Sequence, residues 1–258
     1  MLAPMSARLF VVHGSHPCAT VERALELKGV PFARVELPPP AHALIQRLLF
    51  GGRTVPGIRF DDGEKVQGSR AILARLEERV PSPALLPEDP DAARAVRDAE
   101  RWGDEVLQPL GRTILWPTLQ EHPEAAASFS EGGRLPLPDA ALEAMMPVIA
   151  RLEMRLNRTS AAVRDADLRA LAGHLDRIDG WLADGTLGAQ PVPNRADLQI
   201  APTLALLMTM QDLRDVIAPR PAGALADRLY PGTAGAIARG ALEPGLVGAL
   251  ARPSATKS

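Results

Sequence analysis

Short apolar runs alternate with segments of helical periodicity over the first third of the chain. Residues 8–12 are mostly apolar, as in a buried strand, and the spacing then becomes helical from Pro17 to a predicted helix end at Gly29. Alternating apolar positions at residues 32–37 predict a second strand, and residues 41–50 predict a short helix. This part of the pattern therefore runs strand, helix, strand, helix.

A hairpin and a third helix complete this N-terminal unit. Two short runs, residues 58–60 and 64–66, flank an Asp61-Asp62-Gly63 turn, which is a hairpin signal. Ser69 is the predicted N-cap of the next helix, whose apolar face carries Ile72, Leu73, Leu76 and Val80. The complete order, β-α-β-α-β-β-α, is that of a thioredoxin-like α/β domain.

A proline-rich segment separates this unit from a remainder whose periodicity stays helical. We therefore predict a thioredoxin-like domain at residues 1–82, a linker at 83–90 and an all-α helical bundle at 91–258. The bundle is predicted to begin with a long helix over residues 91–119, kinked at Pro109. The inner face of that helix is predicted to carry Val96, Ala99, Val106, Leu110 and Ile114.

The rest of the bundle is predicted to contain further helices and one long loop. Helices are expected over residues 140–157, 166–184 and 197–210. Residues 121–139 contain Gly132-Gly133 and two prolines, and they predict a loop that is either a lid or a disordered insertion.

Composition and charge exclude several classes of partner. The net charge is −2 and the 29 basic residues form no run, so neither nucleic acid nor an anionic membrane is an expected partner. Cys18 is the single cysteine, so no internal disulfide forms, and the five histidines lack ligand spacing, so no metal is expected. Residues 1–6 do not resemble a signal peptide, and no stretch of about 18 residues is apolar throughout. The expected location is the cytoplasm.

The junction between the first strand and the first helix carries Ser15-His16-Pro17-Cys18. A helix N-terminus favours a thiolate, because positive potential and unpaired N–H groups gather there. One hydroxyl hydrogen bond to a charged sulfur contributes about 1.5–3 kcal/mol, which is the order needed to lower a thiol pKa by about two units. Ser15 is therefore a candidate for activating a bound thiol, and a plain helix cap is the alternative.

Cys18 allows two interpretations. One is the nucleophile of a glutaredoxin-like thiol transferase, and the other is a small buried residue. Redox turns place their reactive cysteine first in Cys-x-x-Cys, a position that Ser15 occupies here, and no second cysteine can complete a disulfide. We favour the buried residue.

The Ser-x-Pro-Cys turn at Ser15 resembles the catalytic turn of theta-type, serine-type glutathione S-transferases. Thr54-Val55-Pro56 is similar to the cis-proline turn of that superfamily, in which the residue before the proline pairs with the ligand backbone. The resemblance implies that Ser15 activates the thiol of glutathione as co-substrate. It also implies that Val55 and Pro56 bind this thiol and that Arg53 holds its terminal carboxylate, with His42 a weaker candidate for the same role.

Two further segments carry the resemblance. Gln67-Gly68-Ser69-Arg70-Ala71-Ile72 resembles the motif in which Ser and a helix N-terminus bind the γ-glutamyl carboxylate, which implies thiol-binding roles for Gln67 and Ser69. It departs from that motif at Gly68, where the family has an acidic residue or Gln. Asn194-Arg195-Ala196-Asp197 resembles the structural capping box of the helical domain, with Asn194 as the cap.

The electrophile pocket is expected between the two domains. By position its candidate residues are His16, Trp102, Trp116 and Met145 or Met146, although a tryptophan or methionine at such a position is more often a core residue than part of a pocket wall. The resemblance implies a cytoplasmic glutathione transferase, a homodimer, that acts on a small-molecule electrophile in detoxification. Two alternatives stay open, namely a glutathione-dependent isomerase of a conjugated substrate and a non-catalytic binding protein of the same fold.

Overall fold

A four-stranded mixed sheet forms the centre of the N-terminal part. The computed structural model describes residues 5–39, 41–134 and 138–250. The first elements are β1 (Ala7–Val11), α1 (His16–Leu27), β2 (Phe32–Glu36), α2 (His42–Phe50), β3 (Gly57–Phe60), β4 (Lys65–Gln67) and α3 (Ser69–Arg79). The strand order is β2-β1-β3-β4, with β1 parallel to β2 and antiparallel to β3. The thioredoxin-like prediction is therefore confirmed.

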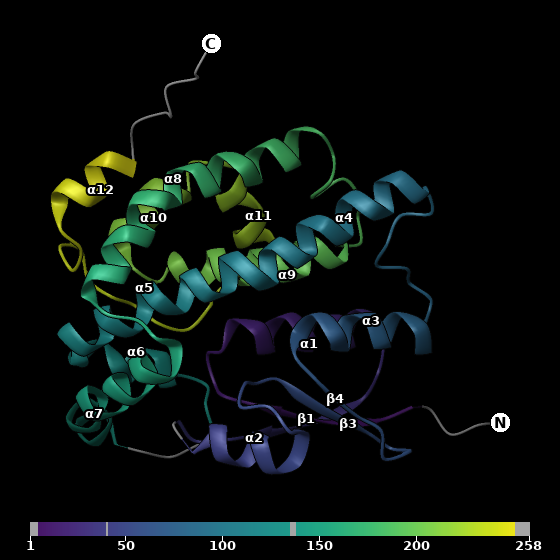
Figure 1. Cartoon of the computed structure of the whole chain (residues 1–258), viewed down its shortest axis with the longest axis horizontal. Coiled ribbons are helices and arrows are strands. Elements are labelled where there is room, and N and C mark those ends of the chain that lie inside the picture. Colours follow the sequence, from purple (N-terminus) through teal and green to yellow (C-terminus); the bar gives the residue numbers. More distant parts are fainter. Residues whose placement is uncertain (1–4, 40, 135–137, 251–258) are drawn as a thin grey trace.

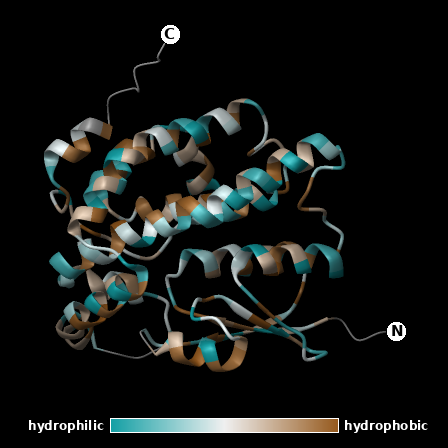
Figure 2. Ribbon diagram, viewed as in Figure 1, coloured by the Kyte–Doolittle hydropathy of each residue, from teal (hydrophilic) through white to brown (hydrophobic). Residues whose placement is uncertain are grey.

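Helices cover both faces of this sheet. Helices α1 and α3 lie between the sheet and the C-terminal helices, whereas α2 lies on the outer face (Figure 1). Helix α2 carries hydrophobic positions at the surface (Figure 2), and Leu44 and Leu48 are 64% and 77% exposed. Helix α1 ends as predicted, because Gly29 takes a φ of 63° that favours glycine over other residues.

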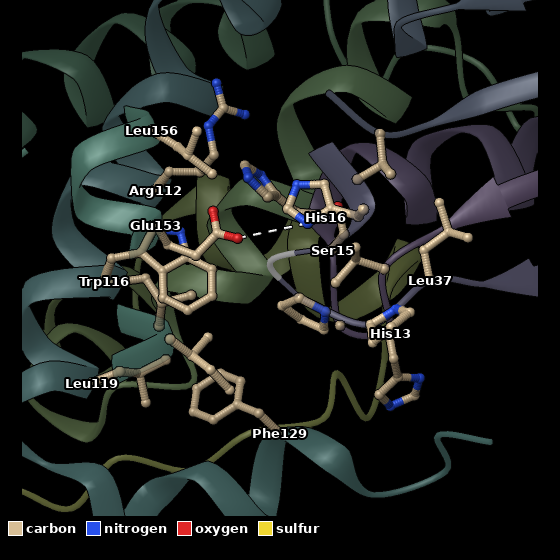
Figure 3. A pocket seen from close by; sticks show the side chains of 18 of the residues that line it. His13, Ser15, His16, Leu37, Arg112, Trp116, Leu119, Phe129, Glu153 and Leu156 are labelled. Carbon is tan, nitrogen blue, oxygen red and sulfur yellow. Dashed lines mark ion pairs between the residues drawn. The ribbon is translucent and has the colours of Figure 1, made fainter. Parts of the chain in front are cut away.

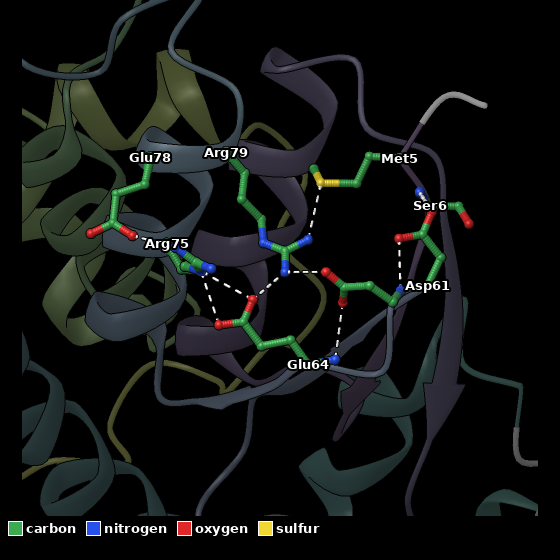
Figure 4. Close-up of polar contacts among 8 residues, drawn as sticks. Met5, Ser6, Asp61, Glu64, Arg75, Glu78 and Arg79 are labelled. Carbon is green, nitrogen blue, oxygen red and sulfur yellow. Dashed lines mark hydrogen bonds and ion pairs between the residues drawn. The ribbon is translucent and has the colours of Figure 1, made fainter. Parts of the chain in front are cut away.

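A charged cluster fastens α3 to the β3–β4 turn (Figure 4). Arg79 pairs with Asp62 at 2.6 Å and also with Glu64, and Arg75 pairs with the same Glu64 at 2.9 Å. The Arg79 guanidinium lies 4.2 Å from the centre of the Phe60 ring. These groups are partly exposed, so they orient the turn more than they stabilise the domain.

The C-terminal part is a bundle of helices. Its elements are α4 (Pro90–Trp102), a π-helical turn (Gly103–Leu107), α5 (Gln108–Glu121), a 3-10 turn (Pro123–Ala125), α6 (Ala126–Ser130), α7 (Asp139–Asn157), α8 (Ala161–Ala183), α9 (Arg195–Leu207), α10 (Gln211–Ile217), α11 (Pro221–Leu229) and α12 (Pro244–Leu250). None of the helices in the described part of the chain is long and apolar enough to cross a membrane. The all-α prediction for this part is confirmed.

Three details differ from the sequence predictions. The long helix is interrupted by the π-helical turn before Pro109, and Val106 is 36% exposed there, because a π-helical turn shifts which residues face inward. The predicted loop at 121–139 contains α6 instead, although residues 135–137 lie outside the described part. Helix α8 begins at Ala161 rather than at residue 166, because Ser160 caps it by accepting from the Val163 N–H.

Helix α9 is the centre of the molecule. All thirteen of its residues are buried, and the predicted capping box is present, with Asn194 accepting from Asp197 N and Asp197 accepting from Asn194 N. Its Leu198 is fully buried in the same hydrophobic cluster as the strands and helices of the N-terminal part. Leu85, from the segment between α3 and α4, joins that cluster too. The two parts therefore share a core.

Candidate functional site

A cavity of about 320 Å³ lies between the sheet domain and the helical bundle. This volume is within the range of small-molecule sites. Its N-terminal wall comes from the β1–α1 turn, the end of β2 and the turn before β3, and its C-terminal wall comes from α5, α6 and α7 (Figure 3). The position agrees with the pocket that the sequence predicted between the domains.

Ser15 lies at the point where the β1–α1 turn enters the helix. It occupies the N-cap position with an extended backbone, and its carbonyl accepts from Cys18 N and Ala19 N. Its hydroxyl makes no capping hydrogen bond, and the residue lines the cavity (Figure 3). The hydroxyl interacts with the Cys18 thiol one helical turn further on, and Ser15 borders a space in which a ligand fits.

Cys18 is a core residue, as we favoured from the sequence. It is 1% exposed and packs among the strands and helices of the N-terminal part. Burial raises the pKa of its thiol to about 12. A thiol that is protonated and enclosed at neutral pH does not serve as a nucleophile, so the glutaredoxin-like alternative is excluded.

His16 links the cavity to the helical bundle. Its side chain is buried, and Nδ1 lies 2.8 Å from Thr203 Oγ1 of α9. Burial lowers the pKa of this imidazole well below its usual value, with a further contribution from Arg112. His16 therefore lines the pocket as predicted, as a neutral ring held across the interface between the two parts.

The turn before β3 also reaches the cavity. The Val55–Pro56 peptide bond is cis, and the Pro56 carbonyl accepts from the N–H of Gly68 at 2.9 Å. Arg53 and Val55 line the cavity, and Arg53 is exposed. Within the described residues Arg53 makes no side-chain hydrogen bond or ion pair, so its charge is available to an anionic ligand.

Gln67 and Ser69 are not brought to the cavity lining. The Gln67 side chain accepts from Gly52 N at 2.9 Å and donates to Thr54 O at 2.7 Å, so it braces the turn that carries Arg53. Ser69 is 2% exposed, and its hydroxyl accepts from the amide groups of two glutamines of the bundle. Ser69 is also not the N-cap of α3, because Gly68 holds that position with a φ of 90°.

Only some of the residues predicted for the electrophile pocket line the cavity. Trp116 and Met145 line the cavity, as does Met146. Trp102 does not, because it ends α4 and its ring packs against His174 and Trp181 of α8 at 5.5 and 5.2 Å. Trp102 is half-buried and packs against the core of the bundle.

On the helical-bundle side of the cavity, two charged residues were not predicted from the sequence. Arg112 of α5 and Glu153 of α7 both line it (Figure 3), and Glu153 Oε1 lies 3.6 Å from His42 Nδ1 of α2. His42 therefore faces the bundle, and burial lowers its pKa. Glu153 could have been found from the sequence, because helical spacing places it on the same face of its helix as the buried Met146 and Ile149.

Burial raises the pKa of Glu153 to about 7, although Asn157 and Arg112 oppose that change. A carboxyl with such a pKa gains and loses a proton near neutral pH, which is a property of acid–base groups in active sites. In the described part of the chain, no group of three or more His, Cys, Asp or Glu side chains has the arrangement of a metal site.

Comparisons with known proteins agree with this architecture. Residues 9–84 match the family described as glutathione S-transferase, N-terminal domain. Glutathione transferase F7 of Populus trichocarpa is similar in structure, with a TM-score of 0.61 at 18% identity over 95% of this chain and 99% of that one.

Two bacterial structures are also similar. A glutathione S-transferase of Methylobacterium radiotolerans, in complex with glutathione sulfonate, gives a TM-score of 0.54 at 21% identity over 88% of this chain and 92% of that one. The beta-etherase LigF of Sphingobium gives 0.58 at 20% identity over 87% and 98%. No curated protein matches the chain in sequence.

Proposed function

We propose that this chain, which has the fold and the N-terminal domain of the glutathione S-transferase superfamily, binds glutathione and activates its thiol through Ser15 for attack on a small electrophile. The observation that carries the proposal is the position of the Ser15 hydroxyl. Ser15 borders a cavity of ligand size at the start of α1, and its hydroxyl makes no capping bond to the backbone of the helix. A hydroxyl and a helix N-terminus together stabilise a thiolate.

The remainder of the cavity suits the other parts of the reaction. Arg53 offers an unpaired cation beside the cis-proline turn, where the carboxylate of a tripeptide can bind. The opposite wall presents apolar side chains, among them Trp116 and Leu119, which suit an apolar electrophile. The glutathione sulfonate bound by the Methylobacterium protein supports glutathione as the thiol.

The Ser15→Ala variant tests this proposal. We expect kcat with glutathione and benzyl chloride to fall at least about tenfold, because the thiolate loses one charge-assisted hydrogen bond of about 1.5–3 kcal/mol. Glu26→Gln, at an exposed position on the same helix, is the control and should retain activity. Product formation by chromatography gives the rates, and unchanged turnover in Ser15→Ala would remove Ser15 from the mechanism.

A non-catalytic binding protein is the second candidate. The burial of Ser69 favours it, because this serine is 2% exposed beneath two glutamine side chains and does not line the cavity in which a γ-glutamyl carboxylate would bind. Calorimetric titration with glutathione separates the two candidates. Binding without turnover of any electrophile would support the binding protein, and absence of binding at millimolar concentration would exclude glutathione for both. The homodimer and the cytoplasmic location implied by the resemblance stay predictions.

A further inference from the structure

The face of the sheet turned away from the helical bundle carries a row of cations. Arg8 of β1 lies directly opposite Arg59 of β3, and Arg59 lies directly opposite Lys65 of β4. Successive residues of a strand point to opposite faces, and the neighbouring Leu9 and Ile58 are buried on the inner side. The three exposed cations therefore share the outer face, and the row spans about 10 Å because adjacent strands lie about 4.8 Å apart.

This row has no acidic partner. Within the described residues the side chains of Arg8 and Arg59 make no hydrogen bond or ion pair, and Lys65 Nζ donates to the Leu49 carbonyl at 3.1 Å rather than to a carboxylate. Like charges directly opposite each other destabilise an antiparallel strand pair. The row therefore costs stability as it stands, and an anion from outside the chain would offset that cost.

An open hollow of about 560 Å³ adjoins the row. Arg8 and Arg59 line it, together with Ala33 of β2, which lies opposite Arg8 on the other side. Because alanine has a short side chain, the sheet is uncovered there. Two residues further along β1, by contrast, the ring of Phe10 packs against Phe50 of α2 at 5.4 Å. A ligand on the uncovered part can reach both arginines.

The acidic residues nearest to the row are engaged elsewhere. Asp62 and Glu64, in the turn that joins β3 to β4, pair with arginines of α3 (Figure 4). Asp61 lines the hollow, but its two carboxylate oxygens accept from Ser6 N at 2.9 Å and from Asp62 N at 3.0 Å. The three cations of the row thus outnumber the one acid that borders the hollow.

We propose that this row is a docking site for an acidic segment of a partner protein, bound in an extended conformation across β1, β3 and β4. In an extended chain, alternate side chains lie on one face about 6.7 Å apart. Two carboxylates at positions i and i+2 therefore span most of the row, and an arginine can donate two parallel hydrogen bonds to one carboxylate. The row faces away from the bundle, so the proposal does not depend on the thiol chemistry (Figure 1).

Two other kinds of polyanion match this surface less well. Binding of nucleic acid rests on many phosphate contacts and, for single strands, on exposed aromatic rings, whereas here Phe10 is half-buried against Phe50. Attraction to an anionic membrane usually needs clusters of about four to eight cations, and the net charge of this chain is −2. An acidic peptide needs only as many cations as it has carboxylates in contact.

The test measures binding of a fluorescein-labelled peptide to the full chain by fluorescence anisotropy. The peptide has about twelve residues of alternating Glu and Thr, which places its carboxylates on one face when it is extended. The same peptide with Gln in place of Glu is the control ligand. We expect the Glu peptide to bind at least about tenfold more tightly, and an increase from about 50 to about 200 mM salt to weaken its binding, because exposed charges are screened.

Arg59→Gln removes the central cation of the row. It should weaken binding of the Glu peptide at least about fivefold, because the peptide loses a charged donor. Arg97→Gln, at an exposed position on α4, removes the same charge away from the sheet and should change binding by less than about twofold. Because Arg59 lies between two like charges, Arg59→Gln should leave Tm unchanged or raise it, so that loss of the fold does not explain weaker binding.

Equal binding of the Glu and Gln peptides would overturn the inference, as would an equal loss of binding in Arg59→Gln and Arg97→Gln. Tighter binding of an oligothymidylate or of phosphatidylserine vesicles than of the Glu peptide, with the same dependence on Arg59, would also overturn it and would assign the row to nucleic acid or to a membrane. Turnover with glutathione is a separate measurement, so the proposed function and this inference can fail independently.

Discussion

The capping box of α9 gives a prediction about stability whose size follows from the structure. Asp197 is fully buried, and its two carboxylate oxygens accept from Asn194 N at 2.9 Å and Gly188 N at 2.8 Å. The change Asp197→Ala leaves both N–H groups without their acceptor. Each buried unsatisfied group costs about 1–3 kcal/mol, so we expect a loss of about 2–5 kcal/mol after partial relaxation.

Urea unfolding followed by circular dichroism measures this loss. In thermal unfolding, the same change should lower Tm by roughly 5–15 °C, because about 1 kcal/mol corresponds to about 2–4 °C in a protein near this size. Glu143→Ala, at an exposed position on α7, is the control and should change stability by less than about 0.5 kcal/mol. A loss below about 1 kcal/mol in Asp197→Ala would refute the argument that these two contacts hold the start of α9.

Two further predictions concern the interface and the thiol site. Gly111→Ala should destabilise the protein by about 1–3 kcal/mol in urea unfolding, because the added Cβ would lie 2.8 Å from Thr203 Cγ2. The control is Gly173→Ala, whose added Cβ meets open space in α8, and it should be neutral or stabilising. Arg53→Gln should raise KM for glutathione at least about fivefold with kcat nearly unchanged, because the carboxylate of glutathione would lose a charged partner. The control is Arg47→Gln, near the end of α2. An unchanged KM in Arg53→Gln would place the glutathione carboxylate elsewhere.

The order of elements was predictable because local signals agree with one another. The helix end at Gly29 and the Asp61-Asp62-Gly63 turn are each set by residues next to them in the chain. Helix α6 was missed because it is short and lies between glycines and prolines, which made the whole segment look like a loop.

The site was only partly predictable, because much of it depends on packing between distant segments. Ser15 and the cis-proline turn were found, since each belongs to a short motif. Periodicity cannot tell that Trp102 packs inside the bundle while Trp116 faces the cavity, because both lie in amphipathic helices. The approach of Glu153 to His42 joins α7 to α2 and leaves no local trace in either segment.

The position of Leu198 has a consequence for how the chain folds. The linker in the sequence suggests two units that could be separated, but a side chain of α9 completes the hydrophobic cluster of the N-terminal part. An isolated thioredoxin-like half would lack that side chain and would expose to water the surface against which it packs. We therefore expect the two parts of the chain to unfold together, and a change in α9 to disturb the packing of α1 as well.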